Sequence, residues 1–248
     1  MRFALLLIPL LLLTGCDPKR IDGPIGGDRG IPFDLVVPVP LADADYYVMA
    51  GTIGRQQSSL VADSIIEVTI WSHYAQFLPA PSGMTDFDVR VNQFRLDRHL
   101  GGDTLRLRSG DDSELRTGNQ IWSLRDSADD SELGRFILPS VGLLDTVGPF
   151  PEIVRSRRPI RSDTAFTLRW ASGGGGVIAI EWVTDNNRVV QTAQDFSGAH
   201  TMLAGTMSTL RGRGTVRVTR FRGINEETGG KTITGIRMSQ VVYEVTVQ

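Results

Sequence analysis

The sequence predicts an all-β protein, and three observations support this fold class. Short segments alternate apolar and polar residues with a period of two, which is the pattern of a strand with one buried face. The 248 residues include 27 glycines and 12 prolines, as expected for a chain with many turns. Long segments with helical periodicity are absent. Apolar residues make up 41% of the chain, which is enough to form a core.

We expect a first β-sandwich domain over residues 34–150. Its predicted strands are marked by apolar residues at alternate positions: Ile66, Val68 and Ile70; Phe87, Val89 and Val91; Leu105 and Leu107; Trp122 and Leu124. The alternation changes parity at Gln93, after which Phe94 and Leu96 are the apolar residues. Such a change predicts a β-bulge or a turn.

Residues 151–163 are predicted to be a linker between two domains. Between Val147 and Asp163 the chain contains three prolines and four arginines: Pro149, Pro151 and Pro159, with Arg155, Arg157, Arg158 and Arg161. Proline restricts the backbone and the arginines repel one another, so the segment is expected to be stiff and basic.

A second β-sandwich domain is expected over residues 164–248. Its predicted strands contain Phe166, Leu168 and Trp170; Ile178, Ile180 and Trp182; Val216 and Val218; and Val241, Tyr243, Val245 and Val247. About seven short strands in fewer than a hundred residues fit an immunoglobulin-like sandwich. Trp170 and Trp182 are the predicted core anchors.

The N-terminus has the pattern of a secretory signal over residues 1–15. Arg2 precedes an apolar run from Phe3 to Leu13, and small residues precede Cys16, the only cysteine. The segment Leu13-Thr14-Gly15-Cys16 resembles a bacterial lipobox. This resemblance implies that diacylglycerol is attached to Cys16, that the chain is cut before it, and that the new amino group is acylated. An ordinary secretory signal and an uncleaved anchor are the alternatives, although the apolar run is shorter than the ~20 residues that span a bilayer.

Residues 16–33 are predicted to be a flexible tether. The segment 17–32 is too polar and too rich in glycine and proline to bury a face, and its expected r.m.s. reach is roughly 20–25 Å. The protein is therefore expected in the bacterial cell envelope, attached to a membrane through Cys16 and facing the periplasm or the cell surface. Asp17 resembles an inner-membrane retention signal of enteric lipoproteins. Other bacterial lineages read this position differently, so the choice of membrane stays open. With Cys16 acylated, no thiol remains for a disulfide.

The two halves of the chain differ in charge. Residues 16–151 carry 12 basic and 20 acidic side chains, a net charge of −8, whereas residues 152–248 carry 13 basic and 8 acidic ones, a net of +5. Opposite charges of this size favour contact between domains or between copies of the chain. The alternative is that both surfaces are simply solvated. Nucleic acid is not an expected partner, because the basic half has no recognisable binding module.

Several segments form a pattern similar to uncharacterised bacterial envelope lipoproteins with tandem immunoglobulin-like sandwiches. They are the segments starting at Gly118 (GNQIWSL), Phe166 (FTLRW), Phe196 (FSGAHTML, followed by Leu210) and Gly214 (GTVRV). The similar residues are core and turn positions. The resemblance therefore implies the fold and transfers no catalytic residue.

The remaining motifs favour structural roles over chemistry. Gly229-Gly230-Lys231-Thr232 ends like a phosphate-binding loop, but Asn225 stands where that loop needs glycine, so a hairpin turn is expected. The run Gly173 to Gly176 is expected to be a flexible turn. The acidic runs 111–115 and 129–133 favour solvated turns over a calcium site, because their spacing matches no known loop. His73, His99 and His200 are far apart, and Ser140 lacks a nucleophile elbow. We expect no cofactor, no metal and no catalytic residue.

Residues 71–81 form the most informative predicted loop. Trp71, His73 and Tyr74 are candidate ligand-binding residues, since aromatic side chains on a loop can stack on a sugar or hold a peptide. Burial of these aromatic residues in the core is the alternative. The predicted function is therefore a non-catalytic binding or assembly module of the envelope, with an envelope protein as a candidate partner. The alternatives are a carbohydrate-binding accessory protein and an envelope hydrolase.

Overall fold

The computed structural model describes residues 44–61, 64–78, 87–92, 94–98, 105–106, 118–173, 176–228 and 230–248. The predicted signal, Cys16 and the tether lie outside these residues. The all-β prediction is confirmed, because strands dominate and pack as sandwiches. Within the described chain the helices are short: α1 (Phe150–Ser156), the 3-10 helix η2 (Asp195–Ser197) and α2 (Ala204–Met207).

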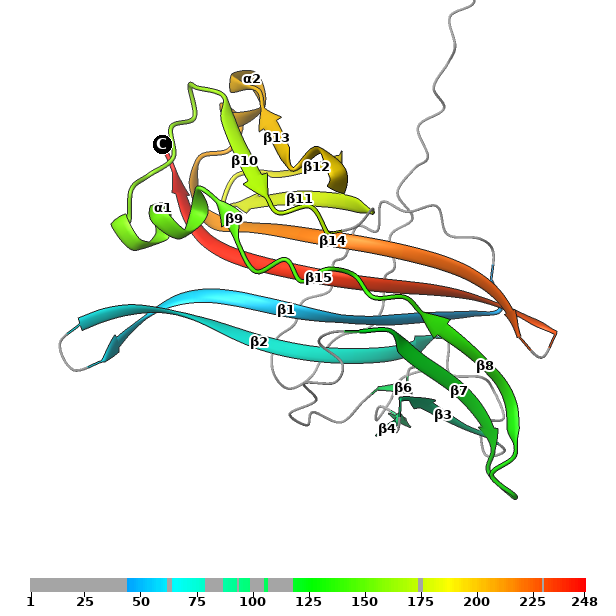
Figure 1. The fold of residues 1–248 in the computed structure, drawn as a ribbon. Helices are drawn as coiled ribbons and strands as arrows, with labels where there is room; N and C mark the ends of the chain where they lie inside the picture. The colour runs from blue at the N-terminus through cyan, green and yellow to red at the C-terminus, as the bar shows by residue number, and fades with distance from the viewer. Residues whose placement is uncertain are drawn as a thin grey trace, which may run out of the picture.

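The largest sheet has eight strands in the order β12-β11-β14-β15-β1-β2-β6-β5 and runs the length of the molecule (Figure 1). Its strands are β1 (Tyr46–Val61), β2 (Ser64–Leu78), β5 (Asp97–Arg98), β6 (Leu105–Arg106), β11 (Val177–Thr184), β12 (Arg188–Gln194), β14 (Gly212–Thr228) and β15 (Lys231–Val247). Every neighbouring pair is antiparallel except β1 and β15, which are parallel.

The hairpin of β14 and β15 forms the centre of this sheet. The two strands are 17 residues each and remain paired from Gly212↔Val247 to Thr228↔Lys231. Gly230 lies in the turn with φ +71°, a conformation that glycine adopts without a steric penalty. The hairpin predicted for the Gly229–Thr232 motif is therefore confirmed.

Two smaller sheets pack against the large one. One has the order β13-β10-β9 and contains β9 (Val147–Gly148), β10 (Phe166–Trp170) and β13 (Ala199–Met202). The other has the order β4-β3-β7-β8 and contains β3 (Phe87–Val91), β4 (Phe94–Arg95), β7 (Gln120–Asp126) and β8 (Glu132–Leu138). Val91 pairs with Phe94, so the predicted change of parity near Gln93 is a turn.

Each small sheet encloses a separate hydrophobic core. The first core, under β9 and β10, contains Phe150 and Tyr243, whose rings stack 4.8 Å apart, together with the predicted anchors Trp170 and Trp182. In the second core, under β3, β7 and β8, Trp122 stacks on Phe136 with ring centroids 5.9 Å apart. Aromatic residues bury a large apolar area, and such pairs add about 0.5–1.5 kcal/mol beyond that burial.

A buried polar belt separates the two cores on the same face of the large sheet. Along β15 the inward positions run from Val241 in the first core, through Ser239 and Arg237, to Ile233 in the second. Arg220 of β14 takes the corresponding place between Val218 and Ile224. The cores are therefore distinct although the sheet beneath them is continuous.

The strands do not pair within the two predicted domains, residues 34–150 and 164–248. β1 belongs to the first of these ranges but pairs with β15 from Tyr46↔Ile233 to Arg55↔Val242, and Ile233 contributes to the second core. The predicted linker 151–163 is also wrong. It contains most of helix α1, and Ile160 bridges to Val247 inside the first core. The prolines and arginines suggested a linker, but the segment is amphipathic, and its apolar residues Ile153, Val154 and Ile160 pack in or against the first core.

Candidate functional site

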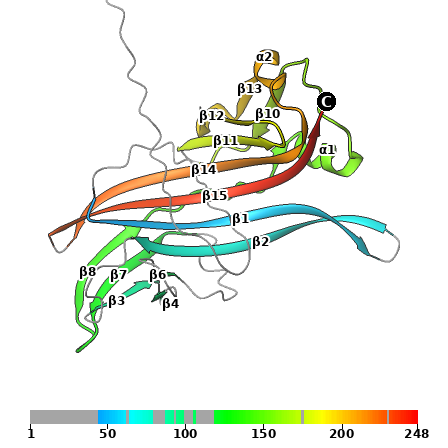
Figure 2. The ribbon, with the colours of Figure 1, turned by 180° about the vertical axis from the view of Figure 1, so that it is seen from behind.

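The large sheet forks at one end of the molecule. The pairing of β1 with β15 ends at Arg55↔Val242, whereas the pairing of β1 with β2 continues to Val61↔Ser64. β15 instead turns toward α1 and the segment that follows this helix, in which the backbone N–H of Ile160 donates to the Thr246 carbonyl over 2.8 Å. Figures 1 and 2 both show β1 and β2 leaving β15 at this end, with α1 beside the C-terminal end of β15.

A groove of about 820 Å³ lies at this fork, and we call it the fork groove. Its helical wall is formed by Ile153, Val154, Arg157 and Arg158. Its sheet wall is formed by Arg213, Gly214 and Thr215 of β14 with Glu244, Val245 and Thr246 of β15. Gln56 of β1 and Asp185, next to β11, complete the lining. Segments nearly 200 residues apart in sequence thus meet in one cavity.

Three arginines give the fork groove its cationic character. Arg157, Arg158 and Arg213 are exposed, and within the described chain their guanidinium groups form no hydrogen bond or ion pair. Other arginines on the same sheet are paired: Arg188 and Arg217 both bind Glu181, with N–O distances of 2.6 and 3.0 Å. Arg157, Arg158 and Arg213 are therefore three unpaired donors that line the same groove.

Two carboxylates also line the fork groove. Glu244 is paired in register with Thr215, and the backbone N–H of Asp185 donates to the Arg213 carbonyl over 3.2 Å. Neither carboxylate accepts a hydrogen bond from a described residue. The groove therefore presents charged donors and charged acceptors that are both available to a ligand, beside the apolar side chains of Ile153, Val154 and Val245.

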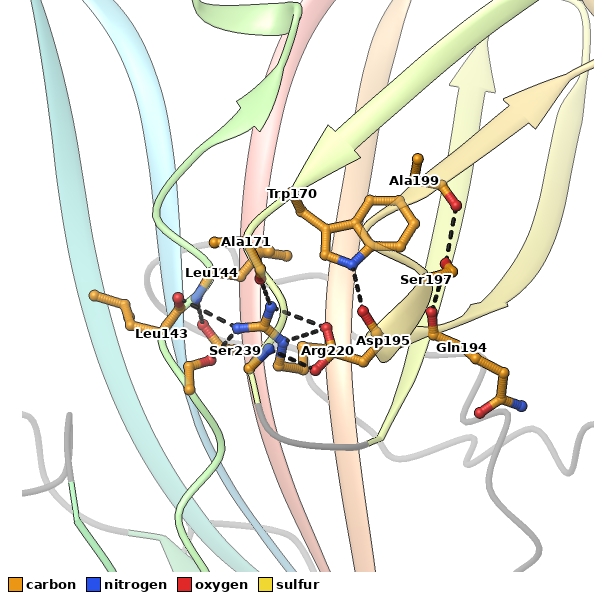
Figure 3. Close-up of polar contacts among 12 residues, drawn as sticks. Leu143, Leu144, Trp170, Ala171, Gln194, Asp195, Ser197, Ala199, Arg220 and Ser239 are labelled. Atoms are coloured by element: carbon orange, nitrogen blue, oxygen red, sulfur yellow. Dashed lines mark hydrogen bonds and ion pairs between the residues drawn. The ribbon is translucent and has the colours of Figure 1, made fainter.

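Arg220 and Asp195 form a buried ion pair in the polar belt between the two cores (Figure 3). Nε of Arg220 donates to Oδ1 of Asp195 over 3.0 Å, and Nη1 donates to the Gly142 carbonyl over 2.7 Å. Nη2 donates to the Ala171 carbonyl. Asp195 also accepts from the Gly173 N–H over 2.8 Å, and its carbonyl accepts from Nε1 of Trp170 over 3.0 Å.

This ion pair has a structural role. Arg220 is 1% exposed and Asp195 is fully buried, so both charges are compensated inside the protein. The guanidinium ties β14 to the segment that crosses the polar belt between β8 and β9. Leu144 of that segment makes a further contact, donating its N–H to Oγ of Ser239 over 2.8 Å.

The candidate binding residues Trp71, His73 and Tyr74 lie in strand β2 and not on a loop. They pair in register with Gly54, Thr52 and Gly51 of β1. The predicted loop is wrong because β1 provides an antiparallel partner for the whole segment up to Leu78, and the local sequence did not reveal this partner. The positions of the three side chains lie outside the described part of the structure.

The other candidate chemical residues are held in local contacts. Nε2 of His200 lies 2.7 Å from Oε1 of Gln191, and burial lowers the pKa of this histidine. Ser140 donates its backbone N–H to Oδ1 of Asn119, and its carbonyl accepts from Arg222. His99 lies outside the described residues.

The second acidic run is the turn between β7 and β8. Asp130 accepts hydrogen bonds from Arg90 over 2.8 Å and from Arg125 over 3.1 Å, so its charge is compensated by arginines. The first run, residues 111–115, is not described. Nowhere in the described part of the chain do three or more histidine, cysteine or acidic side chains form a group that could hold a metal.

Comparison of the chain with protein-family models and with curated proteins gave no match. Helices α1 and α2 have seven and four residues, and no helix in the described segments is long and apolar enough to cross a bilayer. From the sequence, Arg157 and Arg158 were interpreted only as part of a basic linker. The groove could not be predicted, because its opposite wall is formed by β14 and β15, which are distant in sequence.

Proposed function

We propose that the chain is a lipid-anchored protein of a bacterial cell envelope, and that its β body is a non-catalytic binding module with the fork groove as its ligand site. The anchor rests on the lipobox-like segment that ends at Cys16. The observation that carries the binding role is a cavity of about 820 Å³ lined by three arginines that have no acceptor among the described residues. Small-molecule sites typically have volumes of ~300–1,000 Å³ and a few convergent polar groups.

The position of the fork groove suits an anchored binding module. Strand β1 begins beside the β14–β15 turn, where Asp45 binds Nζ of Lys231 over 3.2 Å and accepts from the Thr232 N–H over 2.9 Å. The groove-lining residues of β15 lie about 12 residues further along that strand, which corresponds to about 40 Å at ~3.3 Å per residue. The ligand site therefore lies far from Asp45, which is near the first described residue of the body.

The composition of the fork groove supports binding. Guanidinium groups donate, Asp185 and Glu244 accept, and Ile153, Val154 and Val245 offer apolar contact. Each of these groups can hold part of a ligand without changing its covalent structure. A binding or assembly role is therefore the simplest use of this set of side chains.

The anchor is tested by expressing the full chain and its Cys16→Ser variant in a lipoprotein-processing bacterium. The wild-type chain is expected in the membrane fraction, with diacylglycerol on Cys16 detected by mass spectrometry. The variant is expected to be soluble and free of fatty acid, since two or three acyl chains are needed for stable attachment. A variant that stayed with the membranes, or a wild-type chain without lipid, would contradict the proposal.

The ligand site is tested by incubating the purified chain with the protein-free lipid and polysaccharide fractions of the envelope, followed by native mass spectrometry. A bound molecule is expected on the wild type and not on the double variant Arg158→Glu, Arg213→Glu. The Arg169→Glu variant is the matched control, because Arg169 is exposed on β10 and does not line the groove. Identical spectra for all three chains would remove the fork groove as the site.

A further inference from the structure

We infer that the ligand of the fork groove is a phosphorylated sugar, with the phosphate held by Arg157, Arg158 and Arg213 and the sugar held by Asp185 and Glu244. This inference rests on the proposed function, because it assigns a chemical class to the same site. It follows from three properties of the groove: unpaired guanidinium donors, unpaired carboxylate acceptors, and a volume larger than a single anion requires.

The guanidinium groups account for the phosphate. Arginine presents five N–H donors in a planar fork that fits the oxygen atoms of a phosphate two at a time. Arg157 and Arg158 directly follow α1, and Arg213 comes from the start of β14, on the other wall of the groove. A phosphate between these walls would be bound from two sides. Arg161 is not available for this purpose, because Asp163 accepts two hydrogen bonds from it.

The carboxylates account for the sugar. A carboxylate only accepts hydrogen bonds, so Asp185 and Glu244 would repel a second phosphate but would bind hydroxyl or amino groups. Thr215 and Thr246 lie on the same wall and can both donate and accept. A ligand with an anionic end and a hydroxyl-rich end can bind both kinds of group, whereas an anion without donors would leave the two exposed carboxylates to water.

The size of the groove favours the same ligand. A volume of about 820 Å³ is far more than one phosphate ion fills and lies within the range of small-molecule sites. The apolar side chains of Ile153, Val154 and Val245 can contact the C–H face of a sugar ring. Inorganic phosphate would use only the arginines and should bind more weakly than a phosphorylated sugar.

The test uses calorimetric titration of the full chain in detergent with glucosamine 1-phosphate, a probe that carries phosphate, amino and hydroxyl groups. Binding is expected to be at least tenfold tighter than that of inorganic phosphate or of glucosamine. Arg158→Gln and Arg213→Gln are each expected to weaken binding at least tenfold, and raised salt should weaken it further. Glu244→Gln is expected to reduce the preference for glucosamine 1-phosphate over inorganic phosphate.

Arg169→Gln is the control and is expected to bind like the wild type. Thermal unfolding of each variant shows whether a loss of binding comes from a loss of folding. Equal affinity for inorganic phosphate and glucosamine 1-phosphate would overturn the sugar assignment, and no binding of either would overturn the whole inference. If the envelope fractions still gave an arginine-dependent bound molecule, the proposed function would survive with a ligand of another class.

Discussion

Arg220 and Asp195 lie 25 residues apart in sequence and meet in the interior with a distance of 2.9 Å between Nη2 and Oδ1. The pair sits at the border between the two hydrophobic cores, where β14 passes beneath the segment that joins β8 to β9. Because both charges are buried, each depends on the other and on the surrounding backbone groups for its compensation.

Replacing Arg220 with methionine is therefore expected to lower the free energy of unfolding by about 3–5 kcal/mol. The substitution leaves the Asp195 carboxylate buried without its counter-charge and removes the donor to the Gly142 and Ala171 carbonyls. Urea denaturation followed by tryptophan fluorescence measures the change.

The matched control for this prediction is Arg222→Met on the same strand. Arg222 is exposed and makes one long hydrogen bond, 3.3 Å to the Ser140 carbonyl, so its loss is expected to cost less than about 1 kcal/mol. Equal effects of the two substitutions would show that the buried pair is not specially important for stability.

The backbone contact between β14 and β11 predicts that Gly214→Ala is destabilising. An added Cβ at this position would overlap the Val183 carbonyl oxygen and lie 2.8 Å from Cα of Thr184, so the two strands would have to separate. The expected cost is about 1–3 kcal/mol, as for other overpacked sites. Thermal unfolding would report a lower Tm.

Gly205→Ala is the control for this second prediction. Gly205 lies in α2, and an added Cβ there meets no atom within 4 Å. Alanine also has a higher helix propensity than glycine, so this variant is expected to be neutral or more stable by up to ~1 kcal/mol. A stabilising effect of Gly214→Ala would contradict the observed strand spacing.

The buried phenol of Tyr243 predicts a loss of stability at high pH. Burial raises the pKa of Tyr243 to about 12, against an ordinary value near 10, while its oxygen accepts the Val147 N–H over 2.9 Å. The folded state thus favours the neutral phenol. This contribution is fully present below pH 10 and is lost as the pH rises from about 10 to 12, up to roughly 3 kcal/mol in total.

The alkaline titration can be followed by tyrosinate absorbance and by urea denaturation at each pH. Tyr243→Phe is expected to remove a step near pH 12 from the absorbance titration and to flatten the loss of stability between pH 10 and 12. It should also lower stability by about 1–3 kcal/mol at neutral pH, because the Val147 N–H loses its acceptor. An unchanged titration curve would contradict the assignment.

The hydrogen bond from Leu144 to Ser239 predicts that Ser239→Ala weakens the polar belt. Without Oγ, the buried N–H of Leu144 has no acceptor, which is expected to cost about 1–3 kcal/mol in denaturant unfolding. Ser140→Ala in the same segment is the control, since only backbone atoms of Ser140 form hydrogen bonds in the described structure. A neutral Ser239→Ala variant would mean that another group satisfies this N–H.

The strands and their buried faces were readable from the sequence. The alternating residues of β10, β11 and β15, including Trp170, Trp182 and Tyr243, are buried as their spacing predicted. The same reasoning failed for Trp71, His73 and Tyr74, because aromatic residues near two prolines look like a loop when the partner strand is unknown. It also failed for α1, whose proline and arginine content obscured the contacts of Phe150 and Ile160 with the first core.

What the sequence determined by itself is local: which residues alternate, which segments turn, and the lipobox-like segment that predicts acylation of Cys16. Only the tertiary structure decided that β1 lies parallel to β15, that one sheet carries two cores, that Arg220 meets Asp195, and that α1 closes a groove against β14 and β15. The physical reason is that the alternation reflects the hydrophobicity of each side chain, and the free energy of transferring a side chain out of water is a property of that residue alone. The choice of strand neighbour depends on packing between segments far apart in the chain, and no single segment contains that information.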